Sequence, residues 1–176
     1  FREQNLLLLV LIVLCVTLQW LEQETNFRYD RGSVISGEWY RLFSANFVHL
    51  DISHLLINLT GLVIILYAFS SYLKTIQWLS LIIFSSLFVS TCLFLFNPDI
   101  HYYVGLSGVL HGLFFTGAII EIRRFPIYGW FLTAIIVFKL LWEQVYGSTY
   151  ESIILIDGFV VVWANIIHQI FGNFNK

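Results

Sequence analysis

Long runs of apolar residues, broken by short polar segments, dominate the sequence. Each run approaches the roughly 20 residues that a helix needs to cross the hydrocarbon layer of a membrane. Within the runs nearly every position is apolar, whereas membrane β-strands alternate in polarity. The pattern predicts an all-α membrane protein, one domain over residues 1–176, with six spans at residues 5–21, 52–73, 77–96, 104–121, 126–142 and 153–171.

The first apolar run is expected to be a true span. Leu18-Gln19-Trp20-Leu21 follows it, where a removed signal peptide would need small residues. The composition agrees with a membrane protein, because 59% of residues are hydrophobic and only 11% are charged. So few charges exclude a soluble enzyme, and the lack of a basic tract argues against a nucleic-acid partner.

The distribution of basic residues predicts the orientation in the membrane. With six spans both termini lie on one side, and the excess of positive charge places that side in the cytoplasm. The longest connection, residues 22–51, then lies on the opposite side and has room for short interfacial helices. The basic residues that fall together on the cytoplasmic side are Arg2, Lys74, Arg123, Arg124 and Lys176.

Polar side chains within spans are costly in lipid and are therefore candidates for function. His54 and Asn58 are spaced i, i+4 at the start of the second span, so both lie on one helix face and can donate hydrogen bonds to a common point. The alternative is a polar contact between helices, which Asn and His commonly make in membrane bundles.

A second cluster begins the fourth span with Gly105, Ser107, Gly108 and His111. A serine at a helix N-terminus lies near unpaired backbone N–H groups, which stabilise an anion. Its flanking glycines would let a substrate backbone come close, and His111 lies one turn further along the same face. The alternative is that the glycines serve tight helix packing.

A third cluster lies in the sixth span, where Asn165 and His168 share a face at spacing i, i+3. Either residue alone is also consistent with an ordinary bundle contact. Together, the three clusters supply a serine, a candidate base and hydrogen-bond donors for an oxyanion on spans two, four and six. All three are expected toward the outer half of their spans, where they can meet in one cavity.

No metal or organic cofactor is expected. The five histidines lack the accompanying carboxylates or thiolates of a metal site. Cys15 and Cys92 lie within apolar runs and are interpreted as small buried hydrophobes.

These residues resemble the rhomboid family of intramembrane serine proteases over nearly the whole chain. Gly105-Leu106-Ser107-Gly108 is similar to the family's GxSG nucleophile motif, and His54 with Asn58 to its HxxxN motif. His49 is similar to a further histidine just before that motif, and Tyr40-Arg41 stands where many members have Trp-Arg. The resemblance implies a six-helix rhomboid-like bundle in which Ser107 is the nucleophile. The Ser107 backbone N–H, His54 and Asn58 would form the oxyanion hole, and Gly105, Gly108, His49 and His111 would support it.

Within the family, the chain most resembles the rhombosortases. The segment Gly105–Gly112 and the segment Trp142–Gly147 carry this likeness. It implies a bacterial inner-membrane protease, with its active site open to the periplasm, that cleaves GlyGly-CTERM sorting tails of exported proteins. Its partners would be the C-terminal transmembrane tails of those proteins and membrane lipids.

The sixth span departs from the family pattern. Rhomboids carry the catalytic base there in an AHxxGxxxG-like pattern, and the register of this chain places Asn165 in the histidine position and His168 in the first glycine position. Asn cannot act as a general base. His168 is the alternative base, although it lies about 4.5 Å deeper along the helix than Asn165. A Ser107–His111 pair is a third possibility.

Two other functions stay open at this point. One is a base-dead rhomboid that binds membrane helices without cleaving them. The other is a small transporter that relays protons through His54, His111 and His168.

Overall fold

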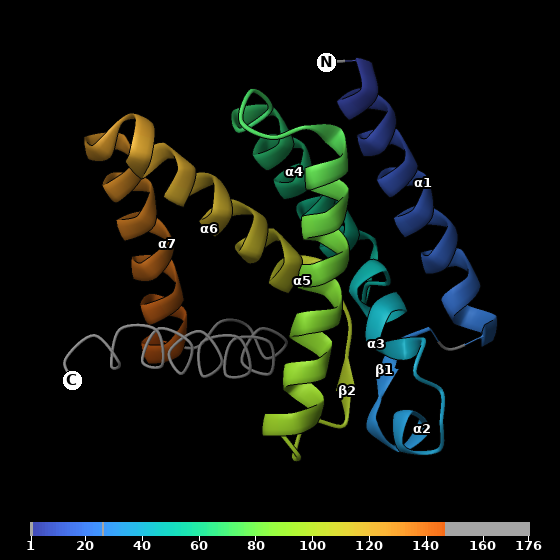
Figure 1. Cartoon of the computed structure of the whole chain (residues 1–176). Coiled ribbons are helices and arrows are strands. Elements are labelled where there is room, and N and C mark those ends of the chain that lie inside the picture. Colours follow the sequence, from blue (N-terminus) through green and yellow to red (C-terminus); the bar gives the residue numbers. More distant parts are fainter. Residues whose placement is uncertain (1, 26, 147–176) are drawn as a thin grey trace.

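The computed structural model describes residues 2–25 and 27–146, and these fold almost entirely as helices (Figure 1). Apolar runs in which every backbone group must find a partner within the segment favour the helix. The elements are α1 (Arg2–Thr25), β1 (Tyr29–Asp30), α2 (Arg31–Ile35), α3 (Arg41–Ser44), the 3-10 helix η1 (Ala45–Phe47), α4 (Ile52–Ala68), α5 (Thr75–Phe96), β2 (Tyr102–Tyr103), α6 (Ser107–Arg124) and α7 (Pro126–Tyr146).

Two of the described helices are long and apolar enough to cross a membrane, at Glu3–Leu21 and Thr75–Phe96. A third crossing results if Arg41–Phe47 and Ile52–Ala68, which are bent by 90° relative to each other, form one broken span. The predicted count of six spans is therefore not confirmed by the described residues. The predicted sixth span, 153–171, lies outside them.

Two helices begin or end at residues other than the bounds of the predicted spans. The second span was expected to reach residue 73, but α4 ends at Ala68. The side-chain amide of Gln4 donates hydrogen bonds to the carbonyls of Ser70 (2.7 Å) and Leu73 (3.1 Å). These backbone carbonyls after α4 are therefore paired with a side chain and not with the next turn of a helix. The fourth span was expected from residue 104 to 121, but α6 runs from Ser107 to Arg124. Gly105 before it has a φ of +116°, which a continuous right-handed helix does not allow.

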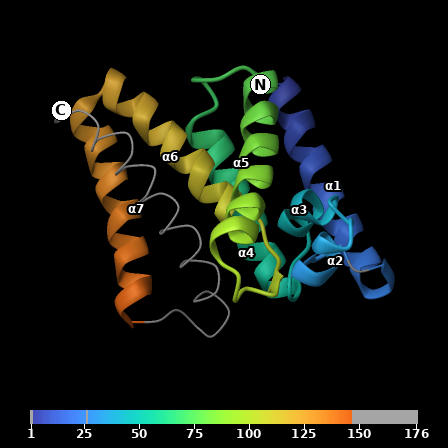
Figure 2. The ribbon, with the colours of Figure 1, turned by 60° about the horizontal axis from the view of Figure 1, so that its bottom comes forward.

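Helix α6 lies at the centre of the described structure and packs against α4, α5 and α7. Figure 2 shows α4, α5 and α6 between α1 on one side and α7 on the other. The buried core includes Leu62 of α4, Trp78 of α5 and Val109 and Leu113 of α6. Dispersion and close packing, rather than hydrophobicity alone, hold such helices together in lipid.

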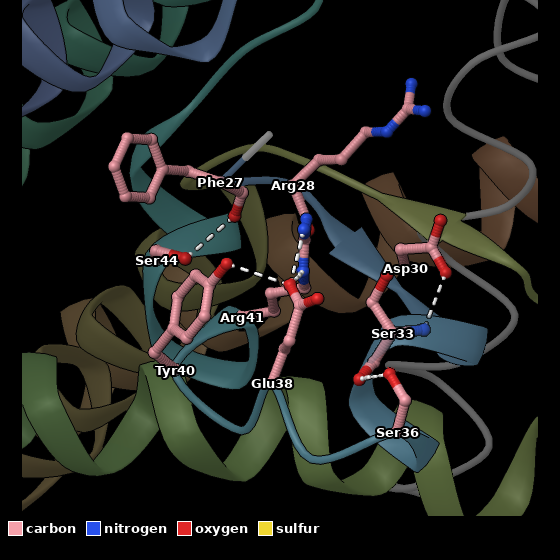
Figure 3. A network of polar contacts seen from close by, with 9 residues as sticks. All are labelled: Phe27, Arg28, Asp30, Ser33, Ser36, Glu38, Tyr40, Arg41 and Ser44. Carbon is pink, nitrogen blue, oxygen red and sulfur yellow. Dashed lines mark hydrogen bonds and ion pairs between the residues drawn. The ribbon is translucent and has the colours of Figure 1, made fainter. Parts of the chain in front are cut away.

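The connection between α1 and α4 holds short helices, as predicted, and a network of polar contacts joins them (Figure 3). The Arg41 guanidinium is buried, and its Nε donates to the Glu38 carboxylate at 2.6 Å. Its Nη1 donates to the Arg28 carbonyl at 3.0 Å, while the Ser44 hydroxyl donates to the Phe27 carbonyl at 2.7 Å. The Arg41 side chain therefore ties the short helices to the chain that leaves α1.

A small antiparallel pair of strands departs from the purely helical prediction. Tyr29 of β1 pairs with Tyr103 of β2, and Asp30 pairs with Tyr102. The Arg28 guanidinium lies over the Tyr102 ring, 4.6 Å from its centroid. The pairing joins the α1–α4 connection to the segment that enters α6, and so positions the start of that helix.

Candidate active site

Ser107 is the first residue of α6, in agreement with the predicted helix N-terminus. The turn before it is held from two sides. The Gly105 amide donates to the Ala45 carbonyl at 3.0 Å, and the buried Tyr103 hydroxyl donates to the Gly105 carbonyl at 2.9 Å. The position of Ser107 therefore depends on η1 and β2 as well as on its own helix.

His54 and Asn58 of α4 adjoin this turn. A Cβ atom placed on Gly105 would lie 2.8 Å from Cε1 and 3.0 Å from Nε2 of His54, and 4.0 Å from Nδ2 of Asn58. Asp51 caps α4 by accepting a hydrogen bond from the His54 amide at 2.8 Å. The structure thus brings the HxxxN residues and the GxSG turn together, although 47 positions separate Asn58 and Gly105 in the sequence (105 − 58).

Asn58 is buried, and its Nδ2 donates to the His54 carbonyl at 3.1 Å within α4. A carboxamide nitrogen has two hydrogens. One of them serves this helix contact, and the group can donate a second hydrogen bond toward an acceptor beside the turn. This arrangement permits, but does not require, the predicted oxyanion role.

The glycines around Ser107 are in contact with protein, which corrects the expectation that they leave room for a substrate strand. Gly105 is covered by His54, and a Cβ on Gly108 would lie 3.0 Å from Val89 of α5. On the next turn, a Cβ on Gly112 would lie 3.0 Å from the Ser85 hydroxyl. The packing interpretation is therefore correct for Gly108, because the small residue lets α6 approach α5.

His111 does not present a ring nitrogen to the Ser107 hydroxyl. Its Nδ1 lies 2.7 Å from the Ser107 backbone carbonyl, and its Nε2 lies 3.4 Å from Nζ of Lys139. Because a carbonyl only accepts, Nδ1 carries the hydrogen and Nε2 accepts from the lysine ammonium. The contact between Ser107 and His111 is therefore one between the His111 ring and the backbone carbonyl of Ser107.

His49 lies between η1 and α4 and is almost fully buried. Its ring packs edge-on against that of His54, with centroids 5.1 Å apart, and its amide donates to Oε1 of Gln19 at 2.6 Å. Burial and, to a lesser extent, the neighbouring His54 lower the pKa of His49 to about 4, while Asp51 acts in the opposite direction. His49 is thus a neutral support for His54 near neutral pH.

A cavity of about 320 Å³ opens beside Ser107, between α4, α6 and α7. Its walls are mainly apolar, and its polar groups come from Asn58, Ser107, His111 and Lys139. Such a cavity favours a mostly apolar ligand whose orientation is set by a few polar contacts. The described residues that line it are Ile57, Asn58, Gly61, Ile65, Ser107, Leu110, His111, Phe114, Ile135, Ile136 and Lys139.

Lys139 was not identified as a site residue from the sequence. The signal was present, because it is a charged residue inside the apolar run predicted over 126–142. The contact of Lys139 with His111 could not be predicted from the sequence, because the two residues are 28 positions apart.

The predicted base positions, Asn165 and His168, lie outside the described residues. Within the described residues there is no cluster of three or more His, Cys, Asp or Glu side chains suited to a metal ion. The described geometry places the Gly105 turn, two residues before Ser107, beside the imidazole of His54 and the carboxamide of Asn58.

A protein-family model described as the rhomboid domain matches residues 36–174. The matched region includes Ser107, His54, Asn58 and the cavity lining. No curated protein matches the chain.

Proposed function

Because the chain belongs to the rhomboid family, a family of intramembrane proteases, we propose that it is a serine endopeptidase of the rhombosortase type. The observation that carries the proposal is the contact of the Gly105 turn, two residues before Ser107, with His54 and Asn58. It supports a nucleophile and oxyanion donors at one point. The family and the apolar helices indicate an integral membrane protein.

In the proposed reaction, Ser107 Oγ attacks the carbonyl carbon of the scissile peptide bond, and the hydroxyl proton passes to a base. The developing oxyanion accepts hydrogen bonds from the Ser107 backbone N–H, His54 and Asn58. The C–N bond then breaks, and the base gives the proton to the leaving amine. Water hydrolyses the acyl-enzyme ester and restores the serine.

The base is proposed to act from the sixth span. His168 is the candidate, because Asn165, which occupies the position of the family's histidine, cannot accept the proton. His111 is a weaker candidate, because its Nδ1 donates to the Ser107 carbonyl and its Nε2 faces Lys139. Its proposed role is to support the start of α6.

We propose GlyGly-CTERM tails as substrates: a small-residue motif, a transmembrane helix and a basic end. The apolar cavity beside Ser107 supports an apolar peptide segment as the ligand. The proposed location is a bacterial inner membrane, with both termini in the cytoplasm and the site open to the periplasm. The proposed domain is a single six-helix unit over residues 1–176.

A second function, binding of membrane helices without cleavage, is favoured by one observation. The register of the sixth span places Asn165 where rhomboids have the basic histidine. A rhomboid without the basic histidine would keep the cavity beside Ser107 for binding a membrane helix but would not cleave the peptide bond.

The test uses a reporter with a Gly-Gly motif, a membrane helix and basic residues at its C-terminus. The chain, Ser107→Ala, His168→Ala and Asn165→His are compared in proteoliposomes, together with labelling of Ser107 by a serine-reactive fluorophosphonate. If cleavage is lost in both Ser107→Ala and His168→Ala, His168 is the base. If only Asn165→His cleaves, the chain is the non-cleaving binder. If no variant cleaves or is labelled, the protease proposal is wrong.

A further inference from the structure

Tyr103 lies shortly before Ser107 in the sequence and is almost fully buried, although its side chain ends in a polar hydroxyl group. It is the last residue of β2, where it pairs with Tyr29 of β1. Its ring packs in a cluster of buried residues that also includes Ala45 and Val89. The strand pair and this packing hold the ring in place, and its hydroxyl reaches the turn that leads into α6.

The Tyr103 hydroxyl contacts the backbone on both sides of Ser107. It donates a hydrogen bond to the Gly105 carbonyl at 2.9 Å. On the other side the Gly108 amide interacts with the hydroxyl oxygen, and a Cβ on Gly108 would lie only 3.2 Å from that oxygen. A phenol can donate one hydrogen bond and accept another at the same time. One side chain therefore holds the backbone before and after the proposed nucleophile.

The hydroxyl keeps its proton near neutral pH. Burial raises the pKa of the Tyr103 phenol above its ordinary value of 10, and the interaction with the Gly108 amide acts in the opposite direction without cancelling the rise. The hydrogen bond to the Gly105 carbonyl is therefore available throughout the pH range in which a serine and a histidine would react.

Helix α6 begins with backbone N–H groups that have no partner within the helix. Ser107 and Gly108 are its first residues, so both of their amides belong to this set. The Leu110 amide already bonds to the Leu106 carbonyl, at 3.0 Å. Because the Gly108 amide is directed to the Tyr103 hydroxyl, the Ser107 amide is the backbone donor that this turn offers to an oxyanion.

We propose that Tyr103 is a positioning residue for the reaction at Ser107: its hydroxyl fixes the backbone at Gly105 and Gly108 and so orients the Ser107 amide toward the oxyanion. The inference rests on the proposed function, because the oxyanion is that of an attacked peptide carbonyl. Tyr103 acts through the backbone and does not touch the substrate. A displaced oxyanion donor lowers the rate of the chemical step more than it weakens substrate binding.

The first test is kinetic and uses Tyr103→Phe, which removes the hydroxyl and keeps the buried ring. With the Gly-Gly tail reporter in proteoliposomes, kcat is expected to fall about 10- to 100-fold, while KM stays within about twofold. Fluorophosphonate labelling of Ser107 should slow by a similar factor, because the phosphoryl oxygen of the adduct uses the same donor. An unchanged kcat in Tyr103→Phe would overturn the proposal.

Tyr29→Phe is the matched control. Tyr29 is also fully buried and lies opposite Tyr103 in the strand pair, and its hydroxyl accepts a hydrogen bond from Nη1 of Arg31 at 3.4 Å. This variant should lower the melting temperature and keep kcat. An equal fall of kcat in both variants would mean that the strand pair only supports the fold, and would overturn the proposal.

A second measurement needs no variant and no activity. In the unaltered chain, labelled with ¹⁵N-glycine in detergent micelles, the Gly108 amide proton should show a nuclear Overhauser effect to the Tyr103 ring. Its absence would overturn the proposal even if Tyr103→Phe does not fold. Where that variant folds, the amide signals of Ser107 and Gly108 should shift in Tyr103→Phe and stay in place in Tyr29→Phe.

The two readouts separate this inference from the proposed protease activity. A chain that neither cleaves nor is labelled contradicts proteolysis, and the amide signals then decide whether Tyr103 positions the Ser107 amide. Cleavage that is indifferent to the Tyr103 hydroxyl supports proteolysis and overturns the inference alone.

Discussion

Gly105 and His54 are in such close contact that a methyl group on Gly105 would lie 2.8 Å from the imidazole Cε1. Gly105 also has a backbone φ of +116°, a conformation that residues with a side chain rarely adopt. Both features concern the turn that leads into Ser107. The absence of a side chain at position 105 is therefore a requirement of the site.

Gly105→Ala is expected to destabilise the protein by about 1–3 kcal/mol through backbone strain, and to abolish fluorophosphonate labelling of Ser107 by displacing His54. Gly37→Ala is the matched control. Gly37 also has a positive φ, of 109°, but no atom lies near its added Cβ. The control should be strained yet still labelled. Equal labelling of the two variants would contradict the proposed role of the His54 contact.

His49 predicts how stability depends on pH. Its folded pKa of about 4 lies below the ordinary value of 6.5, so the unfolded chain binds more protons between these values. The stability supplied by neutral His49 is complete above pH 6.5 and is lost as the pH falls toward 4. The loss amounts to about 3 kcal/mol over this window.

The measurement is the free energy of unfolding in mixed micelles between pH 7 and 4, for the unaltered chain and for His49→Phe. The side chain of the variant does not titrate, so its stability should fall less steeply with acid. His54 and Asp51, which face His49, are present in both proteins, so the difference between the two curves reports the titration of His49 together with its electrostatic coupling to these groups. Parallel curves would show that His49 is not the titrating group.

Asn46 links the α1–α4 connection to α5. It is fully buried, and its Nδ2 lies 3.1 Å from the Ser86 carbonyl and 3.0 Å from the Ser90 hydroxyl. Asn46→Ala should reduce the free energy of unfolding by roughly 1–3 kcal/mol, because it leaves buried polar groups without their donor. The loss is measured by denaturant titration of the folded protein.

Ser80→Ala provides the comparison for Asn46→Ala. The Ser80 hydroxyl also donates to a backbone carbonyl of α5, that of Ile76, but it is exposed. Its removal should therefore change stability by less than about 0.5 kcal/mol. An equal effect of the two substitutions would mean that Asn46 adds nothing specific to the packing of η1 on α5.

Much of the local structure followed from sequence patterns. The helical character of the apolar runs, the place of Ser107 near a helix N-terminus and the short helices between residues 22 and 51 depend on nearby residues and on backbone hydrogen bonding in lipid. The helix ends were less predictable. Gln4 of α1, far away in the sequence, contacts the turn that follows α4. The strand pairing of Tyr103 and the positive φ of Gly105 make α6 begin later than predicted.

The sequence by itself predicted which residues carry the proposed chemistry, because Ser107, His54 and Asn58 occur at short, recognisable spacings. Only the tertiary structure decided their surroundings. It placed His54 against Gly105, turned Gly108 toward α5 and joined His111 to Lys139. Residues distant along the chain make these contacts, and their geometry depends on how whole helices pack, which local periodicity does not specify.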